Sequence, residues 1–104
     1  MQITTQESFA DREIAETLGL VRGNTVRTRH VGKDILAFLR NIVGGEVVEY
    51  TKLMAESREQ ALDRMIREAE SKGADGIVGV RFVTSMVAAQ AAELLVYGTA
   101  VKLR

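Results

Sequence analysis

Residues 51–72 have the sequence TKLMAESREQALDRMIREAESK, and their apolar side chains recur at the spacing of an amphipathic helix. At about 100° per residue these side chains fall within one stripe about 140° wide. The stripe contains Met54, Ala55, Ala61, Leu62, Met65, Ile66 and Ala69. Opposite charges stand four residues apart in the pairs Asp63/Arg67, Arg64/Glu68 and Glu68/Lys72. We predict a helix about 33 Å long that spans the domain and stops at Gly73.

Strand-forming segments lie on both sides of this helix. Residues 14–31 are rich in Val, Thr and Arg and predict one long strand, with Gly19 at a kink or bulge. Residues 2–5 favour a short edge strand. Residues 77–87 and 94–103 predict a C-terminal β-hairpin, and the join at 88–92 is either a loop or a helical turn.

A second, shorter helix is expected over residues 35–43, with Asp34 as its N-cap and Gly44–Gly45 as its stop. Residues 46–50 then connect it to the long helix. The predicted fold class is α+β: a long bulged strand, a short helix, a long amphipathic helix and a C-terminal β-hairpin, with the helices on one face of an antiparallel sheet. We find no linker or repeat, so residues 1–104 are expected to form a single domain.

Composition excludes several classes of function. The chain has 14 Lys and Arg against 14 Asp and Glu, a net charge of +0, which argues against a nucleic-acid binder. No apolar stretch is long enough for a membrane span, and no signal pattern is present, so we expect a cytoplasmic protein without a membrane partner. No Ser-His-Asp order, P-loop or nucleotide fingerprint indicates an enzyme, and no cofactor can be identified.

Metal chemistry within one chain is also disfavoured. The sequence has no Cys and only one His, His30, whereas zinc needs three or four protein ligands. Met54, Met65 and Met86 stand at expected core positions, where packing explains them better than soft-metal ligation. We therefore assign no metal ligand from the sequence.

The two late strands are apolar on both faces, whereas an antiparallel sheet with one wet face alternates apolar and polar side chains. One long helix and one short helix cover only one face of a three-stranded sheet. We predict that a second copy of the chain covers the other face and at least one sheet edge. The alternative is that the short helix wraps around to the second face.

Basic residues gather near the end of the first long strand. The basic patch consists of Arg27, Arg29, His30 and Lys33. It could hold an anion or an acidic partner, which would make the protein a scaffold. We favour the alternative of a solvated edge, or of pairing with acidic groups such as Glu46 and Glu49 of a neighbour, because no aromatic side chains are interleaved for base stacking.

Arg58 falls inside the apolar stripe of the long helix, where a charge is costly unless it is paired. A ligand or anion contact at an interface would explain it. We favour an intersubunit ion pair, or a stem that lies along apolar surface with its head in water.

Several separated motifs resemble those of the YbjQ-like family of small bacterial and archaeal proteins, often described as heavy-metal-binding. The motifs are Gly19-Leu-Val-Arg-Gly23, Asn41-Ile-Val-Gly-Gly45, Tyr50 followed by Arg58-Glu-Gln-Ala-Leu62, Lys72-Gly-Ala-Asp-Gly-Ile-Val-Gly-Val80 and Gly98-Thr-Ala-Val101. The resemblance implies a dodecin-like subunit assembled as a homopentameric ring. It also implies that the family's recurring polar and glycine positions are candidate ligand-binding or interface residues. These are Arg22, Gly44, Gly45, Tyr50 and Arg58.

Two hypotheses follow. The first is a non-catalytic ring whose intersubunit pockets, lined by Tyr50 and Arg58, bind a small ligand or a metal ion. Symmetry would turn one oxygen ligand per chain into a ring of ligands, although the lack of Cys and the single His do not support the heavy-metal description. The second is a scaffold that uses the basic patch.

Overall fold

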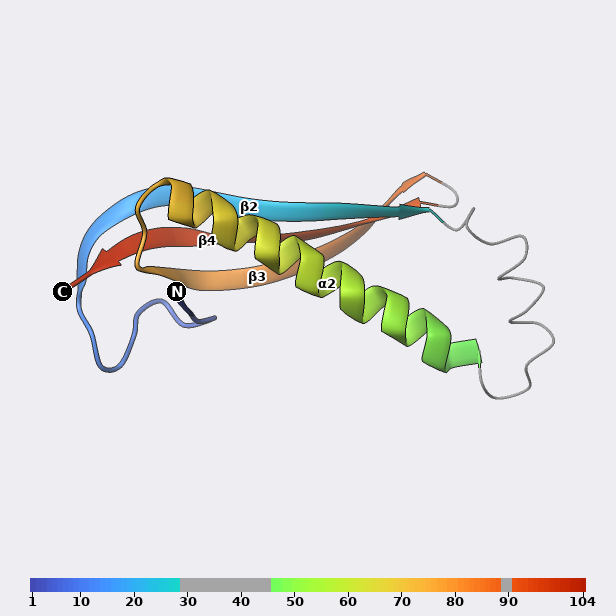
Figure 1. Cartoon of the computed structure of the whole chain (residues 1–104), viewed down its shortest axis with the longest axis horizontal. Coiled ribbons are helices and arrows are strands. Elements are labelled where there is room, and N and C mark those ends of the chain that lie inside the picture. Colours follow the sequence, from blue (N-terminus) through green and yellow to red (C-terminus); the bar gives the residue numbers. More distant parts are fainter. Residues whose placement is uncertain (29–45, 89–90) are drawn as a thin grey trace.

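The computed structural model describes residues 1–28, 46–88 and 91–104, which form four strands and one long helix (Figure 1). The predicted short helix over 35–43, with Gly44 and Gly45, lies outside the described residues. The elements are β1 (Gln2–Ile3), β2 (Ile14–Thr28), α2 (Glu46–Ser71), β3 (Gly76–Ala88) and β4 (Ala91–Leu103).

The four strands make one sheet in the order β1-β3-β4-β2, and α2 crosses one face of it at a slant (Figure 1). β4 pairs antiparallel with both β2 and β3. The α+β prediction is confirmed, but the sheet is mixed because β1 runs parallel to β3, with Gln2 opposite Gly76. A parallel pair needs a long crossover connection, and here β2 and α2 supply it. The prediction of a purely antiparallel sheet is therefore wrong for β1.

The bulge predicted in the first long strand is confirmed. The register between β2 and β4 shifts between Ile14 and Glu16 and again between Thr17 and Gly19. Gly19 has a φ of 113°, a conformation that side-chain-bearing residues rarely adopt. The predicted residues 29–31 of this strand lie outside the described residues.

A second bulge, in β3, was not predicted. Gly79 has a φ of 63°, and the register with β4 shifts between Val78 and Arg81. The extra residue changes which side chains face α2. Ile77 and Val80 both belong to the core beneath the helix, although a regular strand would place them on opposite faces.

The helix α2 begins at Glu46, so the prediction that residues 46–50 form a connector is wrong. The β-branched Val47 and Val48 lower helix propensity by only a few tenths of a kcal/mol each, which does not prevent a helix from starting there. The end is as predicted. The Gly73 amide donates to the Glu70 carbonyl at 2.9 Å, and Gly73 has a φ of 76°, as is typical of a glycine-terminated helix.

The C-terminal hairpin is confirmed and is longer than predicted. β3 continues to Ala88 and β4 starts at Ala91, with these two residues paired across the hairpin. Most of the segment 88–92 is therefore strand rather than a loop or a helical turn, and residues 89–90 lie outside the described residues. Ladder pairing with a neighbouring strand outweighs the weak helix preference of alanine here.

The main core lies between α2 and the sheet. It consists of Val21, Ala61, Met65, Ala69, Ile77, Val80, Val96 and Ala100. A smaller cluster of Val78, Val101 and Leu103, packed with Phe9 and Ile14, lies on the other face of the sheet. The N-terminal segment thus covers part of the second face.

Candidate functional site

The structure places the side chains of two of the predicted site residues, Arg22 and Arg58, and both are exposed. Arg22 lies on β2 between Val21 and Gly23, which face α2, so its side chain points to the opposite face of the sheet. Arg58 lies on α2. Within one chain the sheet separates the two arginines, so they do not share a site.

The other candidates are placed only in part. Tyr50 belongs to α2 and Arg27 to β2, where the Arg27 backbone pairs with Ala92. Gly44 and Gly45 lie outside the described residues, as do the remaining members of the basic patch, Arg29, His30 and Lys33.

Arg58 does not lie in the buried stripe of α2, so that prediction is wrong for a single chain. The buried row runs through Ser57, Ala61, Met65 and Ala69. Residues four apart on a helix are offset by about 40°, so this row winds around α2 as the helix crosses the sheet. At the level of Arg58 the buried direction is that of Ser57, about 100° away. A helical wheel averages over this rotation and therefore places Arg58 inside the stripe.

One flank of α2 closes the outer edge of β2. The Arg64 guanidinium donates through Nη1 to the Asn24 carbonyl at 2.6 Å. The Arg22 amide donates to Oε2 of Glu68 at 3.4 Å. The sequence predicted that Arg64 and Glu68 pair with each other, but both reach to the backbone of β2 instead. Of the other two predicted pairs, Asp63 with Arg67 is present at 3.1 Å.

The opposite flank of α2 carries the row Met54, Arg58, Leu62 and Ile66. The three apolar side chains are half-buried, and Leu62 and Ile66 pack at the margin of the core. Because Arg64 and Glu68 mark the side of the helix next to β2, this row lies on the side of β4 and β3. Arg58 is thus a cation at the margin of an apolar surface, with no hydrogen bond or ion pair to any residue in the described part of the chain.

On the face of the sheet away from α2, one row of side chains crosses three strands. Tyr97 of β4 pairs with Arg22 of β2 on one side and with Arg81 of β3 on the other. Tyr97 is half-buried between the two arginines. Sequence reasoning missed this row, because the bulge at Gly79 sets which β3 residue stands opposite Tyr97.

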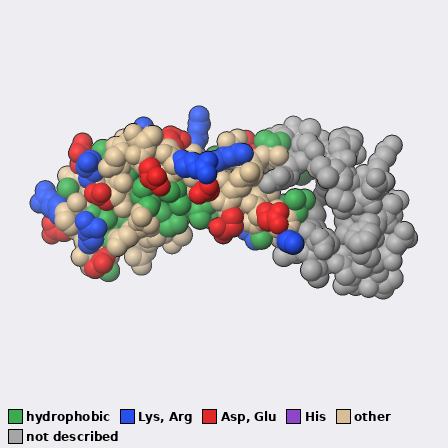
Figure 2. Space-filling model, in the orientation of Figure 1, with side chains coloured by type: hydrophobic (Ala, Val, Ile, Leu, Met, Phe, Trp, Pro, Cys, Tyr) green, Lys and Arg blue, Asp and Glu red, His purple; other side chains and the backbone are tan. Residues whose placement is uncertain are grey.

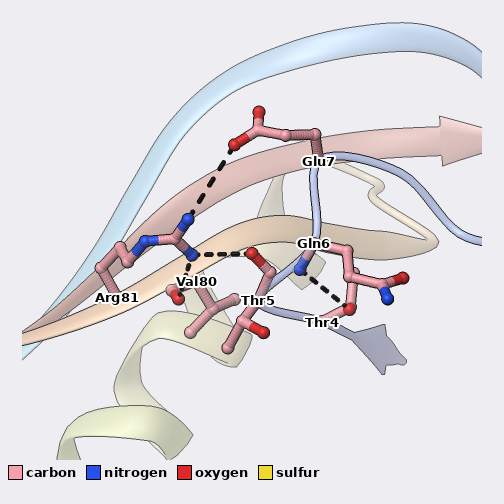
Figure 3. Close-up of polar contacts among 6 residues, drawn as sticks. All are labelled: Thr4, Thr5, Gln6, Glu7, Val80 and Arg81. Atoms are coloured by element: carbon pink, nitrogen blue, oxygen red, sulfur yellow. Dashed lines mark hydrogen bonds and ion pairs between the residues drawn. The ribbon is translucent and has the colours of Figure 1, made fainter.

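Arg81 holds the N-terminal segment against β3 (Figure 3). Its Nη1 donates to the Thr5 carbonyl at 2.7 Å and to the Val80 carbonyl at 2.9 Å. Its Nη2 lies 4.0 Å from Oε1 of Glu7. The role of Arg81 is thereby structural, and its donors are directed at the chain's own backbone rather than at an open site.

The same segment continues the pairing of β1 along β3. The Val80 amide donates to the Thr4 carbonyl at 3.1 Å, and the Gly79 amide donates to the Gln6 carbonyl at 2.8 Å. Phe9 then packs against Gly76, where an added Cβ would stand 2.9 Å from the phenyl ring. Residues 6–12 form an otherwise mostly polar segment. The isolated apolar Phe9 within it is the signal that could have indicated this packing.

A metal centre within one chain does not fit the described residues. They contain no group of three or more His, Cys, Asp or Glu side chains arranged to hold a metal ion. Asp75 is used structurally, since its Oδ2 accepts a hydrogen bond from the Leu103 amide at 3.0 Å. Charges of both signs are interspersed over the described part of the surface in Figure 2, with hydrophobic side chains between them. None of the described helices is long and apolar enough to cross a membrane.

Comparison with known proteins gives close relatives over the full length. A family model described as "Putative heavy-metal-binding", for the YbjQ-like family, matches residues 1–104. A UPF0145 protein of Methanococcus maripaludis is 62% identical over 104 residues, covering 100% of this chain and 93% of the relative. A UPF0145 protein of Halorubrum lacusprofundi is 60% identical over 104 residues, covering 100% of both. The UPF0145 protein of Archaeoglobus fulgidus is 63% identical over 102 residues, covering 98% of this chain and 94% of the relative.

A solved structure supports the fold. It is a protein of unknown function from Pediococcus pentosaceus, assigned to the DUF74 family, and it aligns with a TM-score of 0.67. The identity is 18%, and the alignment covers 100% of this chain and 98% of that chain. This likeness shows the fold alone. None of the names of these relatives indicates a catalytic function.

Proposed function

The chain belongs to the YbjQ-like UPF0145 family, and from that premise we propose that it is a cytoplasmic, non-catalytic homo-oligomer, a pentamer, that binds a small ligand or a metal ion between its subunits. The pentamer is the assembly that the family resemblance implies.

The observation that carries this proposal is the exposure of large apolar side chains on both faces of the sheet. Leu20, Val26 and Val83 are exposed on the face away from α2, and Phe82 and Met86 on the face that α2 crosses. Single exposed apolar residues are ordinary, but five on β2 and β3, the two strands that flank β4, indicate a surface that another molecule covers. A second copy of the same chain is the simplest source of that cover.

Binding between subunits, rather than within one, is supported by the distribution of donors. The described residues of one chain hold no set of metal ligands, whereas symmetric copies would each place one oxygen donor around a common axis. The exposed guanidinium of Arg58, at the margin of an apolar surface, offers a charge that an anion or a neighbouring carboxylate would neutralise. We propose Arg58 and Tyr50 as the residues that line this intersubunit site.

Thermal melting in the presence of ions tests the binding proposal. A ligand that binds only the folded state raises Tm with its concentration. The protein, stripped with a chelator and dialysed, is titrated separately with zinc, nickel, calcium, phosphate and citrate at constant ionic strength. We expect at least one ion to raise Tm in wild type. An anion that does so should raise Tm less in Arg58→Ala, because the guanidinium neutralises its charge. If no ion raises Tm, binding of metal ions and of these small anions is contradicted.

The scaffold hypothesis depends on the side chains of Arg27, Arg29, His30 and Lys33, which the structure does not describe. No observation among the described residues favours it over the ring.

A further inference from the structure

The two outer edges of the sheet differ in how they are finished. On β3, β1 pairs with Gly76 and Ile77, and the N-terminal segment continues to Val80. The N-terminal segment covers the outer edge of β3 as far as Arg81, whose side chain donates to the Thr5 carbonyl. Beyond Arg81, no residue in the described ranges hydrogen-bonds to the outer edge of β3.

The outer edge of β2 is closed by comparison. Arg64 occupies the Asn24 carbonyl and Glu68 occupies the Arg22 amide, and both of these backbone groups point away from β4. Charged side chains at an edge prevent another strand from adding there. A further strand at the middle of β2 would have to displace two charge-assisted hydrogen bonds.

The part of the β3 edge beyond Arg81 has the composition of a strand that pairs with another strand. From Phe82 to Ala88 the sequence is FVTSMVA, with no charge, no Pro and no Gly. Phe82, Val83 and Met86 are 46%, 44% and 60% exposed. A β-rich, uncharged edge of this kind invites edge-to-edge pairing unless a native partner covers it.

The apolar side chains identify the kind of partner. Phe82 and Met86 project to one face and Val83 to the other, so a single added peptide strand would pair the edge but leave both faces exposed. A partner whose own strand is packed on both faces by other segments would also cover these exposed side chains. This chain has such segments, because α2 covers one face of its sheet and the Phe9 segment covers part of the other.

We infer that the outer edge of β3, from Phe82 to Met86, is the surface on which a second copy of this chain adds a strand. The inference rests on the proposed homo-oligomer and names the strand through which it forms. The neighbouring copy does not pair through the backbone edge of its β2 around Arg22 and Asn24, because side chains of α2 already bond to that edge.

A charge placed on the edge tests the inference. Ser85 is exposed and polar, so Ser85→Lys adds a charge without removing an apolar side chain. Val83→Lys is a second variant at the same edge. Thr17→Lys is the control, because Thr17 is an exposed position on β2, the strand at the opposite edge, and is not one of the exposed apolar side chains. Mass is measured by light scattering at micromolar concentration, and far-UV circular dichroism confirms that each variant is folded.

We expect wild type and Thr17→Lys to be oligomers of equal mass, and Ser85→Lys and Val83→Lys to be folded with at least a tenfold weaker association. If folded Ser85→Lys and Val83→Lys keep the wild-type mass, or if only Thr17→Lys dissociates, the β3 edge is not the interface although the homo-oligomer stands. If wild type is itself a monomer, the proposed homo-oligomer fails, and this inference fails with it.

Discussion

Gly23 of β2 lies directly beneath Ala61 of α2, so close that a Cβ on Gly23 would overlap the Ala61 carbonyl oxygen. The same Cβ would stand 2.6 Å from the Met65 amide nitrogen. Because Gly23 has no side chain, the backbone of α2 can approach β2 closely. Val21 of β2 and Met65 of α2 pack in the same core cluster.

Substitution of Gly23 should therefore be costly. Gly23→Ala would force α2 away from β2, and we expect the free energy of unfolding to fall by about 2–3 kcal/mol, as for an overpacked core. Urea denaturation at fixed protein concentration measures this change. The control is Thr17→Ala, an exposed position on the same strand, for which a change within about 0.5 kcal/mol is expected. Equal stability of the two variants would show that the close approach does not constrain the helix.

The bulge at Gly79 gives a second prediction. Gly79 has a φ of 63°, and nothing lies within 4 Å of its would-be Cβ, so a substitution there is resisted by backbone conformation alone. Gly79→Ala should cost about 1–2 kcal/mol, while Gly79→Asn should cost less because Asn tolerates the left-handed region. Thermal or urea unfolding compares the two. A larger loss for Asn than for Ala would contradict a conformational origin.

Arg81 fixes the N-terminal segment, and its removal should loosen that segment without unfolding the domain. In Arg81→Ala we expect hydrogen exchange of the Gly79 and Val80 amides to become faster, because these amides donate to Gln6 and Thr4. Arg67→Ala is the control, since Arg67 contributes an exposed ion pair on α2 within the described part of the chain. Unchanged protection of Gly79 and Val80 would mean that Arg81 does not hold the segment in place.

The closure of β2 by α2 can be tested in the same way. The double variant Arg64→Ala and Glu68→Ala removes both side chains that reach the β2 backbone, so the Arg22 amide should exchange faster. The double variant Asp63→Ala and Arg67→Ala removes the same number of charges from the same helix and should leave the Arg22 amide protected as in wild type. Equal exchange in the two variants would refute the closed edge.

Elements set by local patterns were predictable from the sequence. The i, i+4 spacing of Ala61, Met65 and Ala69 located the long helix, and Gly73 located its end. The start was misplaced because the valines at 47 and 48 favour strands weakly, and no local signal outweighed them. The bulge at Gly19 was found because the glycine interrupts a clear strand pattern.

Features set by distant parts of the chain were not predictable. The parallel pairing of Gln2 with Gly76 depends on a crossover through two intervening elements. The bulge at Gly79 is hidden in a run of valines and glycine that fits a regular strand equally well. Of the candidate site, Arg58 was misplaced because a wheel averages over the winding of the buried row, and the row through Tyr97 depends on the bulge.

The molecular mass of the wild-type protein in solution tests the central claim most directly. The chain has a mass of 11.4 kDa, and light scattering coupled to size exclusion measures the assembly without assuming its shape. At micromolar concentration we expect one species of five chains. A single species at the mass of one chain would contradict the proposal that a second copy covers the exposed apolar side chains.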